Sequence, residues 1–322
     1  MIKYVFKRIL LMLVALFCIT TICFMLIRVL PMSPPEGTTV NQQEIIKDIW
    51  EARGYNKPLI EQYGIYLKGI VTEWDFGTSW KIKSTTPAWD LLVGRLLPTM
   101  IVNLYSLLFS LPLGIAFGVL AAIKKNKWQD HVISTGVMVF VSVPSYVYAF
   151  LLQYLLFFEL GWFKSPIISS LADADGSWFS WKMFVSMIMP ILALSFGQIA
   201  GLTRFTRAEL TETLTSDYML LARTKGLTRA QATTRHALKN AMVPILPSIL
   251  GSFIGILGGS MIIEQIFSIP GVGQLYTQSV FLRDYDVFMM DSIFYTFISL
   301  ASGIIIDISY GFIDPRIRMG ER

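Results

Sequence analysis

Residues 204–244 read RFTRAELTETLTSDYMLLARTKGLTRAQATTRHALKNAMVP and form the most basic stretch of an otherwise largely apolar chain. The stretch lies between two long uncharged runs, each long enough to cross a membrane. Its few acidic residues are outnumbered by Arg204, Arg207, Arg223, Lys225, Arg229, Arg235 and Lys239. Because basic loops of this size stay on the cytoplasmic side, we expect this connection to be cytoplasmic.

The helix-capping residues of this loop predict two short helices. Ser216 or Asp217 can cap the first helix, and Gly226 supplies the left-handed residue that ends it. Thr228 and Gln231 have the spacing of a capping box at the start of the second helix. The loop is therefore expected to be ordered and helical.

The apolar residues of the first short helix lie on more than one side of it. At helical spacing Tyr218, Leu221 and Ala222 share one side, whereas Met219 and Leu220 point elsewhere. One surface cannot bury both sides, so we expect two partners: the chain's own membrane domain and a separate soluble protein. The second helix carries small residues on one face, and a proline is expected to mark the start of the next membrane helix: Ala230, Thr234, Ala237 and Ala241, then Pro244.

The composition of the whole chain is that of a polytopic membrane protein. Of its 322 residues, 54% are hydrophobic and only 15% are charged, and the mean hydropathy is +0.57. A soluble domain has about a quarter of its residues charged. Cytoplasmic loops explain the net charge of +5, so no nucleic-acid partner is expected.

Six apolar runs predict six spans. The first, Ile9–Ile27, follows a basic start and could be a signal peptide, but its length and the lack of a cleavage site favour a retained span. Cys18 and Cys23 are five apart within it, so they are expected to be packing residues without a disulfide. The other runs are Leu96–Ile123, Val132–Phe158, Met183–Thr203, Ala241–Ile263 and Val287–Ile313. The last run is interrupted by Asp291 and Asp307.

The positions of the basic residues predict the orientation. With six spans, the N-terminus, the Lys124–Lys127 connection, the central loop and the tail 314–322 all fall on one side. The loops on the other side, 160–182 and 264–286, are nearly neutral. Both termini are therefore expected in the cytoplasm, at the plasma or inner membrane of a bacterium.

Residues 31–95 form a polar interlude after the first span. Asn41 can cap a helix that Gly54 ends, Pro58 can open another helix, and WDFGTSW at 74–80 predicts a turn. The segment is expected outside the membrane on the extracytoplasmic side. A small lid with packing roles alone is an alternative reading.

Glycines at helical spacing occur in two of the runs. Gly114 and Gly118 predict close helix packing. In the fifth run, either packing or the lining of a wide passage would suit Gly251, Gly255, Gly258 and Gly259. Beyond that run come Glu264, expected near the outer membrane boundary where it can be solvated, and a tight turn, FSIPGVGQL, at 267–275.

Several of these segments resemble one family. The run DYMLLARTKGLTRAQATTRHALKNAMVPIL resembles the cytoplasmic loop of ABC-importer permeases in the oligopeptide/dipeptide branch, most closely the oligopeptide B-type subunit. YNKPLIEQYGIYLKGI with DFGTS, FSIPGVGQL and RDYDVFMM extend the resemblance over nearly the whole chain, to Asp314-Pro315-Arg316. The family's Glu-Ala-Ala is Leu220, Leu221 and Ala222 here, which removes the acidic contact.

The resemblance implies a type I importer permease fold that is all helical with six spans. It implies four parts: 1–30 with the first helix, the extracytoplasmic insertion 31–95, the five-helix core 96–313 with the coupling loop 204–243, and the tail 314–322. The coupling residues it implies are Asp217, Tyr218, Leu221, Ala222, Arg223, Lys225 and Gly226. It implies a pore lined by the fifth-span glycines, and an outer gate or binding-protein docking site at Glu264, Pro270, Gly271, Gly273, Arg283 and Asp284.

The resemblance also implies partners: a homologous second permease, two ABC ATPases and an extracytoplasmic peptide-binding protein. ATP and Mg²⁺ would bind the ATPases, because this chain has no P-loop and no other catalytic or metal motif. Two alternatives stand beside peptide import: an ATPase-independent secondary transporter or channel, and an intramembrane enzyme. Within the family, dipeptide, nickel and glutathione import remain open.

Overall fold

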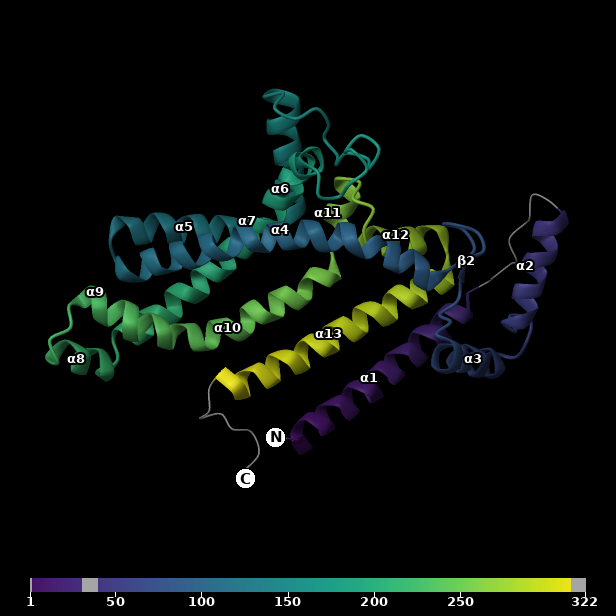
Figure 1. Ribbon diagram of the computed structural model, residues 1–322, viewed down its shortest axis with the longest axis horizontal. Helices are drawn as coiled ribbons and strands as arrows, with labels where there is room; N and C mark the ends of the chain where they lie inside the picture. Colours follow the sequence, from purple (N-terminus) through teal and green to yellow (C-terminus); the bar gives the residue numbers. More distant parts are fainter. Residues whose placement is uncertain (1, 31–39, 314–322) are drawn as a thin grey trace.

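Almost all regular structure in the chain is helical (Figure 1). The computed structural model describes residues 2–30 and 40–313; the tail 314–322, expected in the cytoplasm, lies outside the described residues. In the N-terminal part the elements are α1 (Ile2–Arg28), α2 (Val40–Ala52), α3 (Leu59–Lys68), the π-helical η1 (Gly69–Glu73), β1 (Thr78–Ser79) and β2 (Thr86–Pro87).

The membrane part follows in one continuous series. Its elements are α4 (Ala88–Ile123), α5 (Trp128–Ser142), α6 (Ser145–Leu152), η2 (Gln153–Glu159), α7 (Trp181–Leu214), α8 (Asp217–Thr224), α9 (Arg229–Ala232), η3 (Thr233–Ala237), α10 (Leu238–Gly255), η4 (Ile256–Gly258), α11 (Met261–Ile266), α12 (Val272–Leu282) and α13 (Tyr285–Ile313).

Five helices of the described chain are long and apolar enough to cross a membrane: those within α1, α4, α7, α9–η4 and α13. A sixth candidate is the pair formed by α5 and α6–η2, which is bent by 97°. The predicted run Val132–Phe158 is therefore not one straight helix. Val143 is extended before Pro144, and Pro144 has no N–H to continue the helix, so the chain turns there. The all-helical membrane fold is confirmed, with five or six spans.

The fifth predicted span begins earlier than expected. Pro244 lies inside α10, and the continuous helical stretch runs from Arg229 to Gly258. The second short helix of the basic loop is thus the first part of a membrane-crossing helix. The expectation that Pro244 marks the start of that helix was wrong, because neighbouring turns keep a proline within a long apolar helix.

The helices α4 and α7 lie against each other at glycines. A Cβ added to Gly114 would lie 2.9 Å from Leu202 Cβ, and one added to Gly118 would lie 2.5 Å from Thr206 Cβ. Close helix packing at Gly114 and Gly118 is therefore confirmed. Elsewhere α13 packs against both α1 and α10 (Figure 1).

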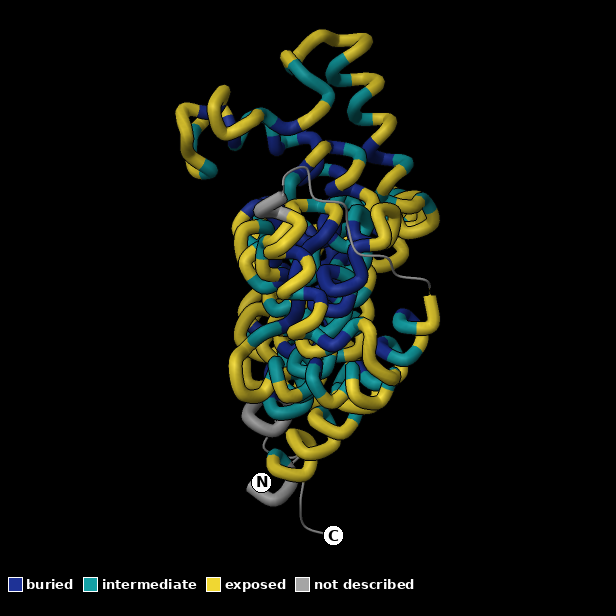
Figure 2. Tube along the Cα trace, turned by 90° about the vertical axis from the view of Figure 1, so that its right-hand side faces the viewer, coloured by how far each residue is buried: buried dark blue, intermediate teal, exposed yellow. Residues whose placement is uncertain are grey.

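The two ends of the molecule differ. In Figure 1, α8 and α9 lie at one end of the long axis, and the start of α1 and the end of α13 point toward that end. The insertion with α2, α3 and β2 lies toward the opposite end. Figure 2 shows exposed positions along the outside of the helices and buried positions between them. Many of the exposed side chains are large and apolar, as in the outward face of α1, which suits contact with lipid or another membrane subunit.

The insertion is mostly as predicted. Gly54 has a positive φ of 67° just after α2, and Pro58 is the N-cap of α3. The segment 74–80 is more than a turn, because Thr78 and Ser79 pair antiparallel with Pro87 and Thr86. This two-stranded ribbon is an addition to the otherwise helical fold.

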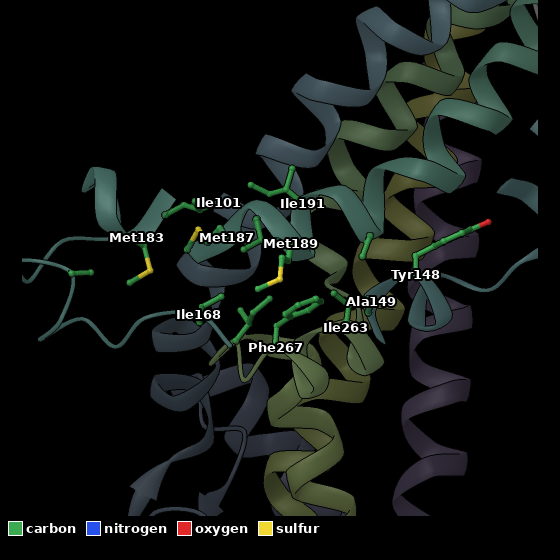
Figure 3. Close-up of a cluster of buried hydrophobic side chains, with 14 residues drawn as sticks. Ile101, Tyr148, Ala149, Ile168, Met183, Met187, Met189, Ile191, Ile263 and Phe267 are labelled. Carbon is green, nitrogen blue, oxygen red and sulfur yellow. The ribbon is translucent and has the colours of Figure 1, made fainter. Parts of the chain in front are cut away.

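A buried cluster ties the loop 160–182 to the membrane helices (Figure 3). Met183, Met187 and Met189 of α7 meet Ile263 and Phe267 around α11. The backbone N–H of Ile168 donates to the carbonyl of Phe267 at 3.1 Å. The turn after α11 is thereby held against the loop 160–182.

Candidate functional site

The two ends of the helix α8 differ in how they are capped. Ser216 occupies the N-cap position with extended backbone, but its hydroxyl donates to the Thr213 carbonyl at 2.6 Å instead of capping the helix. At the other end Gly226 has φ +90°, as predicted. Its N–H donates to the carbonyl of Arg223, and that of Leu227 donates to the carbonyl of Ala222. This pair of bonds is a Schellman motif, so Gly226 fixes how the chain leaves α8.

The next helix starts with the predicted capping box. Thr228 accepts from the N–H of Gln231, and the Gln231 side chain accepts from the N–H of Thr228 at 3.0 Å. The turn between α8 and α9 is therefore specified on both sides. The loop is ordered and helical, as its capping residues indicated.

One face of α8 packs against the chain itself. Met219 and Ala222 are buried in a cluster with Leu210 of α7 and with small residues of the next helix. The predicted grouping was wrong, since it placed Ala222 beside Tyr218 and Leu221 and Met219 away from it. Ala222 is only 6% exposed and so does not offer its side chain to a partner.

The opposite face of α8 has no cover within the described chain. Tyr218, Leu220 and Leu221 are 37%, 65% and 56% exposed. Leu220 was not among the predicted coupling residues, because helical spacing alone could not show which face the membrane helices would cover. Asp217, Arg223 and Lys225 are also exposed, so charges flank the apolar face.

The small-residue stripe of the next helix is confirmed at Ala237 and Ala241 and wrong in its first half. Ala230 and Thr234 are exposed, and the buried residues are Ala232, Thr233, Ala237 and Ala241. The π-helical turn η3 (Thr233–Ala237) explains the shift, because one extra residue in a turn rotates the following face.

A charged pair connects α5 to α7 near this end. The Arg207 guanidinium makes two bonds to the Asp130 carboxylate, at 2.6 Å and 2.8 Å. Asp130 is 2% exposed and also accepts from the N–H of Asn126. A bidentate pair fixes the relative orientation of its two side chains. The pair therefore holds α5 against α7 near the end of α7 that leads into α8.

At the opposite end Glu264 organises the turn after α11. Its carboxylate accepts from the Thr99 hydroxyl at 2.8 Å and from the N–H of Gln274 at 2.9 Å. The alternative of a solvated interfacial glutamate is excluded, because Glu264 is 3% exposed. Burial raises the pKa of Glu264, and these hydrogen bonds oppose that rise.

Glycines let this turn close around the carboxylate. A Cβ on Gly271 would lie 2.3 Å from Thr99 Oγ1, and one on Gly273 would lie 2.9 Å from the Met261 nitrogen. Gly259 has φ +60° and would place its Cβ 2.5 Å from Glu264 Oε1. Each of these three positions requires glycine, because neighbouring atoms lie too close to leave room for a Cβ.

The four glycines predicted to line the fifth span do not all lie on one face of a helix. The α-helix ends at Gly255, and Gly259 lies in the turn that follows. Gly251 packs against α13, since an added Cβ would lie 2.7 Å from Ile306 Cδ1. A Cβ on Gly255 or Gly258 would meet no atom of the described chain within 4 Å. Of the predicted pore residues, these two remain candidates for lining a passage.

The expected docking residue Asp284 is buried inside the insertion instead. Its carboxylate accepts from the Ser79 hydroxyl at 2.6 Å and from the N–H groups of Trp80, Lys81 and Ile82. Being 0% exposed, Asp284 does not present its side chain at the surface of the described chain. Its neighbour Arg283 is exposed in the left-handed conformation, with φ 56°. Pro270 is half-buried and lines a cavity beneath the loop 160–182.

Asp286 makes a second link that the sequence analysis did not predict. It accepts from Arg28 Nη2 at 2.9 Å, from the N–H of Thr78, and from the hydroxyl of Tyr55. The acidic residues of RDYD could have indicated this link, because residues two apart at the start of a helix can both face the preceding loop. Asp284 and Asp286 together hold the insertion to α13.

The described chain is thus a multi-pass membrane protein with a helical loop at one end whose outer face is uncovered. Residues 114–319 match the family model "binding-protein-dependent transport system inner membrane component", and residues 1–101 match that family's N-terminal membrane component. The chain belongs to this family of ABC-importer permeases. Permease subunits of this family are not enzymes and carry no cofactor of their own, and the same holds for this chain.

Similar proteins cover the full length of the chain. It is 37% identical to a dipeptide transport system permease of Lactococcus lactis subsp. cremoris, over 99% of this chain and 100% of that protein. It is 31% identical to an oligopeptide transport system permease of Haemophilus influenzae, with the same coverage. A glutathione transport system permease of Escherichia coli is 31% identical over 99% of both chains.

A solved structure supports the fold. A chain of the methionine ABC transporter in an inward-facing conformation matches with a TM-score of 0.50, at 18% identity. The match covers 69% of this chain and 97% of that chain. The expected ABC-importer permease fold and multi-pass membrane location are thus confirmed.

Proposed function

We propose that this chain is one of two permease subunits of an ATP-driven importer that brings peptides into the bacterial cell. The relatives at 31–37% identity that act on dipeptides, oligopeptides and the tripeptide glutathione support a peptide substrate. Oligopeptides are the substrate we favour, on the motifs of the B-type subunit. The second permease subunit is a homologue of this chain, and an extracytoplasmic binding protein delivers the peptide.

The exposed face of α8 is the observation that carries this proposal. Tyr218, Leu220 and Leu221 present apolar side chains to water at the basic end of the molecule. An apolar face of this kind, rimmed by Arg223 and Lys225, is typical of a protein-docking surface. We assign it to a cytosolic ATPase, of which two serve the paired permeases.

The mechanism follows from how α8 is attached. Its inner face is packed on α7 and on the helix that begins at Arg229. When the ATPases close on ATP, a push on α8 would reach α7 and α10 as a rigid-body displacement and open the passage to the other side. The Arg207–Asp130 pair would carry the same displacement to α5. Residues 204–243 and both termini are cytoplasmic in this proposal, and residues 31–95 are extracytoplasmic.

A pull-down of the ATPases tests the docking assignment. Leu221→Asp puts a charge into the exposed face without disturbing the buried face, so the variant should insert normally and lose most of its bound ATPases. Thr234→Asp is the matched control, because Thr234 is exposed on the adjoining helix outside this face. Equal recovery of the ATPases with both variants would refute the assignment.

A further inference from the structure

The helix α3 of the insertion packs along the last turns of a membrane span (Figure 1). The Tyr63 hydroxyl bonds to the Thr21 hydroxyl, and the Tyr63 ring lies 5.1 Å from that of Phe24. Thr21 is seven residues before the end of α1 at Arg28, which is about 10 Å along a helix. Thr21 and Phe24 both belong to the apolar span Val5–Arg28. The contacts of α3 therefore reach into the depth of the span and do not stop at its end.

Two more spans begin beside α3 and η1. Tyr66 of α3 shares a buried cluster with Met289, in the second turn of α13. Trp74, which ends η1, has its ring 5.3 Å from that of Trp89, in the first turn of α4. Tryptophan is enriched where spans meet the membrane surface. The segment formed by α3 and η1 thus lies where α1, α4 and α13 reach the membrane boundary.

The side of this segment that makes none of these contacts is apolar. Ile60 and Val71 are 80% and 81% exposed. Leu67 follows Ile60 by seven positions and precedes Val71 by four, so the three residues share one face. Lys57 and Lys68 are exposed just before α3 and at its last residue. An apolar face with lysines beside it is typical of a helix that lies in the surface of a bilayer.

The bilayer is the partner that the position of this face favours. At the same level of the first span and just after it, the exposed side chains of Ile22, Leu26 and Val29 are also apolar. Lipid that surrounds the end of this span is therefore within reach of α3. Large aliphatic side chains that are four-fifths exposed are costly in water and are stabilised by transfer into lipid.

We propose that α3 and η1 form an interfacial helix whose exposed face, made by Ile60, Leu67, Val71 and Trp74, is immersed in the lipid at the membrane boundary. The insertion is then held in place by the bilayer as well as by α1 and α13. Its first helix, α2, has no part in this anchor. The proposal needs only the membrane location of the chain, so it stands independently of ATPase docking and of the substrate.

Nitroxide labels test where the exposed face lies. Ile60→Cys and Val71→Cys carry the label on the face, and Glu61→Cys and Thr72→Cys are matched controls at the exposed neighbouring positions. Each is made in a full-length chain without its two native cysteines and is purified into phosphatidylcholine vesicles with no other protein. Electron paramagnetic resonance then compares collisions with oxygen, which concentrates in lipid, and with a nickel chelate, which stays in water.

The ratio of oxygen to nickel collisions should be at least about threefold higher at Ile60→Cys and Val71→Cys than at the two controls, as immersion of one helix face in lipid predicts. Equal ratios at all four positions would overturn the proposal. It would also be overturned if both face positions were open to the nickel chelate in vesicles and became protected only when an extracytoplasmic binding protein was added. That outcome would assign the face to the binding protein.

Discussion

Thr99, Glu264 and Gly271 form a contact that has no room for another atom. The Thr99 hydroxyl donates to Glu264 and accepts from the N–H of Val272, so it links α4 to the turn on both sides. Gly271 lies directly against both side chains. A single methyl group here would separate the carboxylate from its donors.

We predict that Gly271→Ala destabilises the chain and Gly255→Ala does not. The added Cβ at Gly271 would lie 2.3 Å from Thr99 Oγ1, and such overpacking costs roughly 1–3 kcal/mol. At Gly255 the Cβ enters open space in a helix, where alanine is favoured. Thermal unfolding of the two purified variants measures this difference. Equal unfolding temperatures would show that the turn can relax around a methyl group.

At the scale of elements, the turn between α8 and α9 decides how the exposed helix is presented. Gly226 has φ +90°, and an added Cβ would meet no described atom within 4 Å. Any cost of substitution therefore comes from the backbone and not from a clash. A β-branched residue in this conformation costs roughly 1–3 kcal/mol.

We predict that Gly226→Val inserts into the membrane but retains fewer ATPases than Gly226→Asn. Valine resists the left-handed conformation and tilts α8, whereas asparagine tolerates it. Membrane fractionation reports insertion, and co-purification reports the bound ATPases. If valine and asparagine retain the ATPases equally, the angle set by Gly226 does not control docking.

Much of the architecture could be predicted from local patterns, because it depends on neighbouring residues. The lengths of the apolar runs predicted the membrane helices. Gly226 and the capping box of Thr228 and Gln231 predicted the turn within the basic loop. What could not be predicted depends on distant contacts. Glu264 is buried by Thr99, 165 positions away, and Asp284 by the turn after Ser79. Which face of α8 is exposed also followed only from how α7 and the helix that begins at Arg229 cover its opposite face.

The whole molecule has two chemically distinct ends. We predict that the end with α8 is cytoplasmic and the insertion end extracytoplasmic. In a chain whose Cys18 and Cys23 are replaced by alanine, Ser84→Cys should react with an impermeant thiol reagent on intact cells, and Thr234→Cys should not. Both positions are exposed, so lysed cells should label both equally. Labelling of Thr234→Cys but not of Ser84→Cys on intact cells would reverse the orientation.

The central claim is that the ATPases drive peptide import by acting on the exposed face of α8. Its most direct measurement is the uptake of a labelled oligopeptide by the reconstituted complex, with binding protein outside and ATP inside proteoliposomes. The Leu221→Asp complex should lose at least nine-tenths of its ATP-driven uptake, and the Thr234→Asp complex should transport at the unmodified rate. Unmodified uptake by the Leu221→Asp complex would contradict the claim.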